Sequence, residues 1–88
     1  MIRKRLVISG RVQGVFFRET LRKEAERRGV SGSARNLDDG RVEVILEGDP
    51  ERVAEVKRWC RQGPSMARVE SVEETDETFE GLDGFATF

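Results

Sequence analysis

The sequence predicts a two-layer α+β sandwich, in which two helices cover one face of an antiparallel sheet. Two stretches, at residues 16–28 and 50–62, have apolar residues at helical spacing. Short apolar or alternating stretches, typical of strands, precede, separate and follow them. The 88 residues are enough for a single domain, residues 1–88, with one modest core.

The first half of the chain predicts a strand, a helix and a hairpin. These elements are, in order, a strand at residues 5–9, a helix at 16–28 and two strands at 31–37 and 41–47. In the helix, Phe17, Leu21 and Ala25 recur at every fourth position and form the stripe that we expect to be buried. Gly29 follows as a helix stop.

The turn of the hairpin decides which face of its strands meets the core, because a slip of one residue exchanges the faces. A two-residue loop would place Arg35 on the core side. A three-residue loop with Gly40 in the left-handed region avoids this. We expect the second register, with these pairs: Asn36 opposite Val42, Ala34 opposite Val44, and Gly32 opposite Leu46.

The second half begins with a strong helix start. Asp49 is a good N-cap, Pro50 suits the first helical position and Glu51 complements the helix dipole. The expected buried stripe consists of Val53, Val56 and Cys60, and the helix should end at Gly63. The remaining chain predicts a strand at 67–74 with Ala67, Val69 and Ser71 on one face, an acidic loop at 75–84 and a short last strand at 85–88.

The order β-α-β-β-α-β, with one extra short C-terminal strand, is the split βαβ or ferredoxin-like pattern. In this pattern the strands at 5–9 and 31–37 run in the same direction on either side of the strand at 41–47. Their carboxyl ends share one edge of the sheet. With a strand spacing of about 4.8 Å, Asn36 should therefore lie roughly 10 Å from the end of the first strand.

Residues 10–18 lead from the first strand directly into the first helix and predict an anion site. A helix start leaves backbone N–H groups unpaired at the positive end of the dipole. Arg18 adds a planar guanidinium that matches two oxygens of a phosphate or carboxylate. A cation in the first turn is disfavoured by about 0.3–1 kcal/mol unless an anion is nearby. The alternative is that Arg18 is an ordinary solvated residue.

Composition excludes several classes of function. The 16 Lys and Arg against 17 Asp and Glu give a net charge of −1, so the basic excess of a nucleic-acid binder is missing. With no His and one Cys, Ser-His and Cys-His nucleophile pairs are excluded, and a dedicated zinc site is not expected. There is no leader or long apolar run, so we expect a cytoplasmic protein. We also expect that the protein needs no cofactor.

The chain resembles the acylphosphatase family over nearly its whole length. The stretch Gly10-Arg11-Val12-Gln13-Gly14-Val15-Phe16-Phe17-Arg18, followed by Ala34-Arg35-Asn36-Leu37-Asp38-Asp39-Gly40-Arg41-Val42-Glu43, is similar to the two signature segments of that family. Gly63-Pro64-Ser65-Met66-Ala67-Arg68-Val69 also resembles it.

The resemblance implies hydrolysis of the carboxyl-phosphate bond of acyl phosphates without a metal or a covalent intermediate. It assigns orientation of the attacking water to Asn36 and phosphate binding to Arg18 together with the loop backbone. The loop residues are Gln13, Gly14, Val15, Phe16 and Phe17. Expected partners are therefore a small acyl phosphate, with inorganic phosphate or sulfate as a product-like ligand. We expect a monomer that binds neither nucleic acid nor membrane.

Four further residues bear on the stability and the geometry of the site. Ser33 stands where the family often has an aromatic residue, which bears on rate and stability. Phe16 and Phe17 are expected in the core. The C-terminal carboxylate of Phe88 is a candidate for holding Arg18 in place.

Two alternatives belong to other classes of function. An RNA-binding module of this fold would carry an aromatic-rich signature on its sheet, which is missing here. A module that binds a small anion or a protein without turnover could use the same loop. It would have little use for a water-positioning amide at Asn36.

Overall fold

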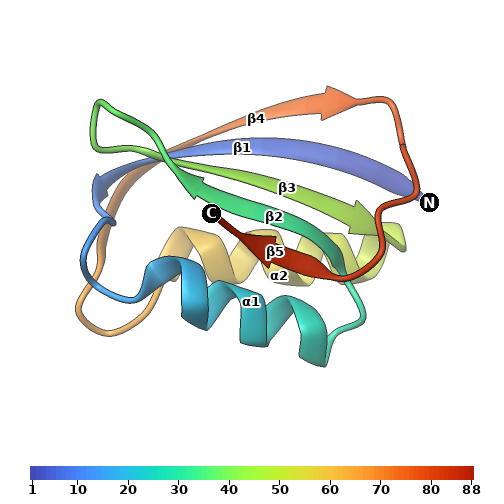
Figure 1. The fold of residues 1–88 in the computed structure, drawn as a ribbon, viewed down its shortest axis with the longest axis horizontal. Coiled ribbons are helices and arrows are strands. Elements are labelled where there is room, and N and C mark those ends of the chain that lie inside the picture. The colour runs from blue at the N-terminus through green and yellow to red at the C-terminus, as the bar shows by residue number, and fades with distance from the viewer.

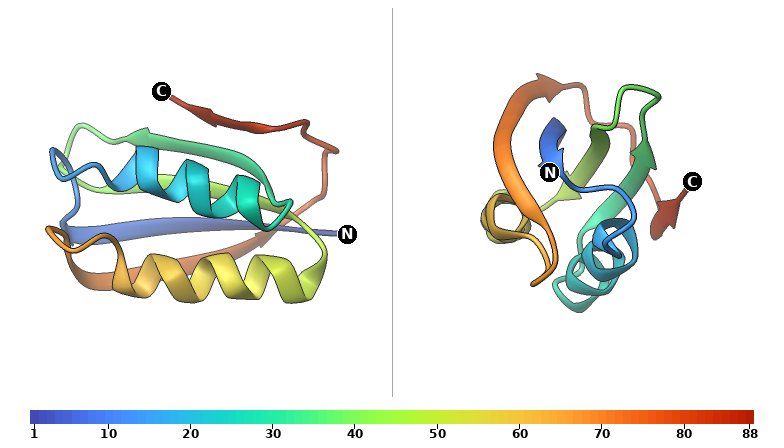
Figure 2. Two further views of the ribbon diagram at one scale, coloured as in Figure 1. Left: turned by 90° about the horizontal axis from the view of Figure 1, so that it is seen from below. Right: turned by 90° about the vertical axis from the view of Figure 1, so that its left-hand side faces the viewer.

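A computed structural model describes all residues, 1–88, as five strands and two helices. The elements are β1 (Ile2–Arg11), α1 (Phe17–Arg27), β2 (Ser31–Asn36), β3 (Val42–Gly48), α2 (Pro50–Gln62), β4 (Arg68–Glu77) and β5 (Phe85–Thr87). Both helices lie side by side on one face of the sheet, and the other face is uncovered (Figures 1 and 2). The predicted two-layer ferredoxin-like sandwich is confirmed. Neither helix has the length and apolar character that a membrane span requires.

The sheet has the strand order β4-β1-β3-β2-β5. β1 and β2 are both antiparallel to β3, so they run in the same direction and end at the same edge, as predicted. The sheet is mixed and not wholly antiparallel, because β5 pairs in parallel with β2. The reason is that β4 runs opposite to β2 and the chain then reverses once in residues 78–84 before it reaches the far edge (Figure 1).

The core lies between the sheet and the helices. α1 buries Phe17, Leu21 and Ala25, and α2 buries Val53, Val56 and Cys60, which are the predicted stripes. The rings of Phe17 and Trp59 join the two helices with their centroids 5.5 Å apart. Burial raises the pKa of the Cys60 thiol, so this side chain acts as a small hydrophobic group and not as a nucleophile.

The β2–β3 hairpin has the expected register, with Asn36 opposite Val42 and Ala34 opposite Val44. The N–H of Leu37 donates to the carbonyl of Arg41 at 2.8 Å, which leaves a three-residue loop closed by Gly40 with a φ of 95°. The side of the hairpin that carries Asn36 therefore faces the helices, as the turn chemistry predicted.

The prediction for β4 was wrong in two respects, the end of the strand and the residues that face the core. The strand continues to Glu77, so the acidic loop comprises residues 78–84, because basic side chains of β1 pair with the acidic ones: Arg3 Nε lies 2.8 Å from a carboxylate oxygen of Glu77. The register also shifts between Ser9 and Gly10. Because of this bulge, Val69 and Val72 pack against the core and Ser71 is exposed.

Candidate active site

The loop between β1 and α1 presents an uncapped helix start. Phe16 is the N-cap of α1 and no side chain accepts a hydrogen bond from this end of the helix. By contrast, the side chain of Asp49 caps α2 by accepting from the N–H of Glu51 at 2.9 Å. The first N–H groups of α1 therefore lack a side-chain acceptor, and an anion would satisfy them.

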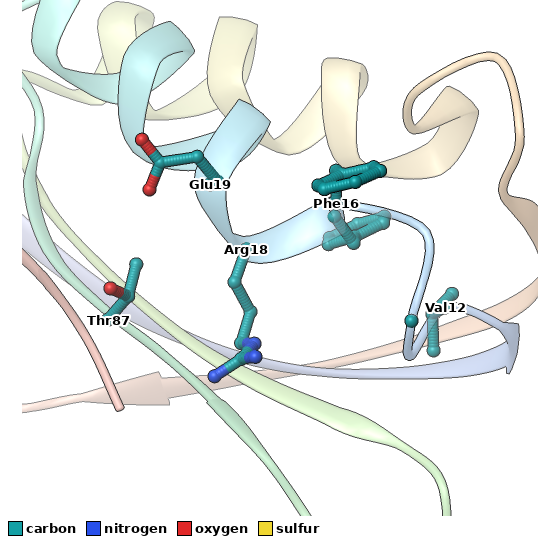
Figure 3. A pocket seen from close by; sticks show the side chains of 7 residues that line it. Val12, Phe16, Arg18, Glu19 and Thr87 are labelled. Atoms are coloured by element: carbon teal, nitrogen blue, oxygen red, sulfur yellow. The ribbon is translucent and has the colours of Figure 1, made fainter.

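A cavity of about 300 Å³ opens at this helix start. Its wall comprises Val12, Gly14, Phe16, Phe17, Arg18, Glu19 and Thr87. In Figure 3 the Arg18 side chain extends away from α1 into the space between Thr87 and Val12. Of the predicted phosphate-binding residues, Gly14, Phe16, Phe17 and Arg18 thus line the cavity.

The guanidinium of Arg18 donates to one protein acceptor, and its other N–H groups have none. Its Nη1 donates to the backbone oxygen of Phe88, the residue that was a candidate for this contact. Further along α1 and at its C-cap, Arg22, Arg27 and Arg28 all pair with glutamates, whereas Arg18 pairs with no carboxylate side chain. The remaining N–H donors of its guanidinium are therefore available to an anion in the cavity.

Gln13 and Val15 do not line this cavity. The Nε2 of Gln13 donates to the carbonyls of Leu37 at 2.8 Å and Arg41 at 2.9 Å, so its side chain ties the loop to the β2–β3 hairpin. The side chain of Val15 is buried and borders a neighbouring groove. Any role of these two residues in phosphate binding rests on their backbone N–H groups.

Asn36 lies at the end of β2 and is not on the wall of the cavity. Its strand reaches the cavity through Ala34, which pairs with Thr87 of the cavity wall. The Oδ1 of Asn36 is buried and has no hydrogen-bond partner in the protein, and no other buried side-chain oxygen or nitrogen shares this condition. Topology thus brings Asn36 to the same edge as the loop, as expected.

The prediction that Phe16 is a core residue was wrong. Its side chain is 75% exposed, whereas Phe17 is 1% exposed and central to the core. The cause is the backbone of Phe16, whose φ of 63° and ψ of 24° belong to the left-handed region. This turn sends the side chain of Phe16 outward and lets the helix begin with Phe17 facing the sheet.

The acidic side chain on the wall of the cavity is neutralised by its own helix. Glu19 forms a salt bridge with Arg22, and hydrogen bonding from that guanidinium holds the pKa of Glu19 below its ordinary value, against a smaller opposing effect of burial. Arg22 therefore offsets the negative charge of Glu19, and this limits the repulsion between Glu19 and an anion beside Arg18.

One contributor to the site, Thr87 of β5, was missed at the sequence level. Thr87 lines the cavity, and the next residue, Phe88, is the candidate whose backbone oxygen meets Arg18. No spacing in the sequence indicates Thr87. Its placement depends on three residues of parallel pairing between β5 and β2, which has no local signature.

The fold and the cavity define a small α+β domain with an uncapped helix N-terminus beside a cavity. A family model, Acylphosphatase, matches residues 4–87, and the chain belongs to the acylphosphatase family. The acylphosphatase of Rubrobacter xylanophilus is 57% identical over 79 residues, covering 90% of this chain and 72% of that protein. That of Thermococcus kodakarensis is 54% identical over 84 residues, covering 96% and 92%.

A solved structure gives the same result for the fold. The crystal structure of acylphosphatase from Bacillus subtilis superposes with a TM-score of 0.96 at 32% identity and covers 100% of this chain and 99% of that one. Enzymes of this family hydrolyse acyl phosphates, and membership supports that activity for this chain.

Proposed function

We propose that the chain hydrolyses acyl phosphates to a carboxylate and inorganic phosphate by direct attack of water on phosphorus. Arg18 and the backbone N–H groups of Gln13, Gly14, Val15, Phe16 and Phe17 bind the phosphate, and Asn36 positions the water. The substrate is a small molecule, and inorganic phosphate is both product and product-like ligand.

The uncapped start of α1 and the free donors of Arg18 support phosphate binding at this place. Phosphoryl transfer depends mainly on positioning and on stabilising the charge of the equatorial oxygens. Backbone N–H groups and a guanidinium supply both from fixed positions. The scarcity of acid-base side chains in the cavity is therefore compatible with this reaction.

The buried Oδ1 of Asn36 is the observation that carries the catalytic assignment. A buried acceptor without a partner is unfavourable by about 1–3 kcal/mol. Because Asn36 as a whole is only half-buried, a small movement of its side chain would bring Oδ1 to a water at the strand end, and a water that donates to this oxygen would have its own oxygen directed away from Asn36. Binding of an anion alone gives no reason to keep such a group at the strand end.

The reaction balances without a base on the enzyme. The oxygen of water forms a bond to phosphorus, the bond between phosphorus and the acyl oxygen breaks, and the acyl group leaves as a carboxylate. The proton of the water passes to a phosphate oxygen, because an amide such as Asn36 does not accept a proton near neutral pH. A carboxylate is a stable leaving group, so no general acid is required.

The test is release of phosphate from acetyl phosphate in the presence of a chelator, for the wild type, Arg18→Ala and Asn36→Ala. We expect full activity of the wild type and a loss on the order of 10²–10³-fold in turnover for each variant, the effect of removing a preorganised donor. Asn36→Ala should still bind inorganic phosphate in calorimetry, whereas Arg18→Ala should bind it poorly.

Arg27→Ala is the matched control, since Arg27 is an exposed arginine of the same helix that pairs with Glu24 at its far end. It should retain wild-type turnover and phosphate affinity. Folded Arg18→Ala and Asn36→Ala proteins with undiminished turnover would show that the site has been assigned to the wrong residues.

A further inference from the structure

We infer that Gln13 is a positioning residue, whose side chain sets the distance between the bound phosphate and the water at Asn36. This inference rests on the proposed function. The Nε2 of Gln13 donates to the carbonyl oxygens of Leu37 at 2.8 Å and Arg41 at 2.9 Å. These two residues close the β2–β3 turn, because the N–H of Leu37 donates to the carbonyl of Arg41. Gln13 therefore connects the phosphate-binding loop to the strand that ends at Asn36.

No other hydrogen bond of the loop makes this connection. Residues 12–15 form no backbone–backbone hydrogen bond, and Gln13 carries their only polar side chain. The loop is otherwise fixed by the buried side chains of Val12 and Val15. Apolar contacts of this kind are not directional, whereas a hydrogen bond fixes a distance and an angle. The placement of the loop against the hairpin thus depends on the amide of Gln13.

A primary amide has the right chemistry for this link. Its NH₂ group offers two donors, one for each carbonyl oxygen of the turn. A carboxylate in the same place could only accept, so it could not bind either carbonyl. The amide is also uncharged, so it neither repels the phosphate nor competes with it for Arg18. Gln13 can therefore hold the loop without altering the charge of the anion site.

The phosphate donors and the water belong to two different elements, and Gln13 sets their relative position. The proposed phosphate ligands lie in one continuous segment, residues 13–18, and would move together. Asn36 is held separately, through the pairing of β2 with β3. A shift of the loop would change the distance from phosphorus to the water and would leave the donors around the phosphate as they are. A misplacement of about 1 Å lowers a rate on the order of 10²-fold.

Loss of the Gln13 amide should leave the hairpin folded, because both carbonyl oxygens keep another donor. The oxygen of Leu37 also accepts from the N–H of Gly40 at 3.2 Å, and that of Arg41 accepts from the N–H of Leu37 at 2.8 Å. Neither oxygen is left buried without a partner, which is the costly case. The effect on turnover can therefore be measured on folded protein.

The test compares hydrolysis of acetyl phosphate and inhibition by inorganic phosphate in the wild type and in Gln13→Met, which keeps the length of the side chain and removes both donors. We expect kcat to fall by about 10–100-fold and the inhibition constant of phosphate to change by less than about twofold. Gln13→Ala is a second variant and should give the same split. A collapsed or unfolded loop would instead weaken phosphate binding together with turnover.

A double variant tests whether Gln13 acts through Asn36. In the Asn36→Ala background, Gln13→Met should lower kcat little further, because the water that it helps to place is no longer held. Asp39→Ala is the matched control. The carboxylate of Asp39 accepts from the N–H of Arg41 at 3.1 Å and from its Nε at 2.8 Å, so it supports the same turn without contacting the loop. Its kcat should equal that of the wild type.

Three results would overturn the inference alone: a wild-type kcat in Gln13→Met, equal losses of turnover and phosphate affinity, or the full loss repeated in the Asn36→Ala background. A loss in Asp39→Ala as large as in Gln13→Met would do so as well, since stiffness of the turn would then be the cause. Undiminished turnover of Asn36→Ala by itself would defeat both this inference and the proposed function.

Discussion

At the scale of single residues, two glycines of the 10–18 stretch have different roles. Gly10 lies where β1 approaches β4 at the bulge, and a Cβ there would be 2.1 Å from the backbone oxygen of Arg68. Gly14 has a φ of 73°, but a Cβ there would have no neighbour within 4 Å. Glycine is required at position 10 because two backbones pack closely there. At position 14 it is required only because the backbone is left-handed.

These two positions give a matched pair of substitutions. Gly14→Ala should lower the free energy of unfolding by about 1–2 kcal/mol, the penalty of a left-handed residue with a side chain. Gly10→Ala should lower it by more than about 3 kcal/mol, because the bulge must also move. Urea denaturation measures both. Equal losses would show that the approach of β1 to β4 is looser than the structure indicates.

The sequence predicted that Asn36 and the 10–18 loop share one edge of the sheet, and the strand order confirms it, because both positions depend on chain order and on a turn with clear chemistry. It failed for Phe16, since an apolar residue next to a buried stripe looks like a core residue unless its backbone is known to be left-handed. The unsatisfied Oδ1 of Asn36 is likewise a property of three-dimensional packing and has no sequence signature.

At the scale of elements, the two helix starts differ in what satisfies their N–H groups. α2 has its own acceptor in Asp49, while α1 has none. Asp49→Ala should therefore reduce the free energy of unfolding by about 1 kcal/mol, whereas Asp49→Asn, which keeps an acceptor oxygen, should reduce it by much less. Thermal denaturation measures the two variants, and equal melting temperatures for both would contradict a capping role.

Helices and the hairpin could be predicted because their caps, stripes and turn residues are local signals. The end of β4 and the direction of β5 could not. An acidic stretch looks like a solvated loop until Arg3 and Lys4 are found opposite it across the sheet. β5 has only three residues, and its pairing with β2 is decided by the return of the chain through residues 78–84.

At the scale of the whole molecule, a buried carboxylate links the sheet to the site. Glu47 of β3 is 1% exposed and accepts from the N–H groups of Glu80 at 2.7 Å and Leu82 at 2.6 Å. Arg3 Nη1 donates to it at 3.1 Å. Glu47 therefore anchors the 78–84 loop, and that loop leads into β5, which presents Thr87 to the cavity and is followed by the backbone oxygen that meets Arg18.

Glu47→Ala should reduce the free energy of unfolding by about 3 kcal/mol, because it leaves buried donors and Arg3 without their acceptor. It should also weaken binding of inorganic phosphate, since β5 loses its anchor. Glu47→Gln keeps an acceptor and should be milder in both respects. Calorimetric phosphate titrations on folded protein decide the second effect: unchanged affinity in Glu47→Ala would show that β5 stays in place without the anchor.

The ionisation of Glu47 should make the free energy of unfolding depend on pH. Burial opposes ionisation of Glu47, but the N–H groups of Glu80 and Leu82 and the Arg3 guanidinium outweigh it and hold the pKa of this carboxyl below its ordinary value. Its stabilisation is therefore fully present above about pH 4.3, the unfolded value, and is lost as the pH falls through the native pKa. The stability gap between wild type and Glu47→Gln should be smaller at pH 3 than at pH 7. A gap that stays constant would contradict this.

The most direct test of the mechanism is the fate of the oxygen of water. Hydrolysis of acetyl phosphate by the wild type in ¹⁸O-labelled water, corrected for the spontaneous reaction and followed by mass spectrometry, shows which atom is attacked. Attack on phosphorus by a water that Asn36 positions predicts one labelled oxygen in each inorganic phosphate released and none in acetate. Label in the acetate would mean attack on the acyl carbon and would contradict the role proposed for Arg18 and Asn36.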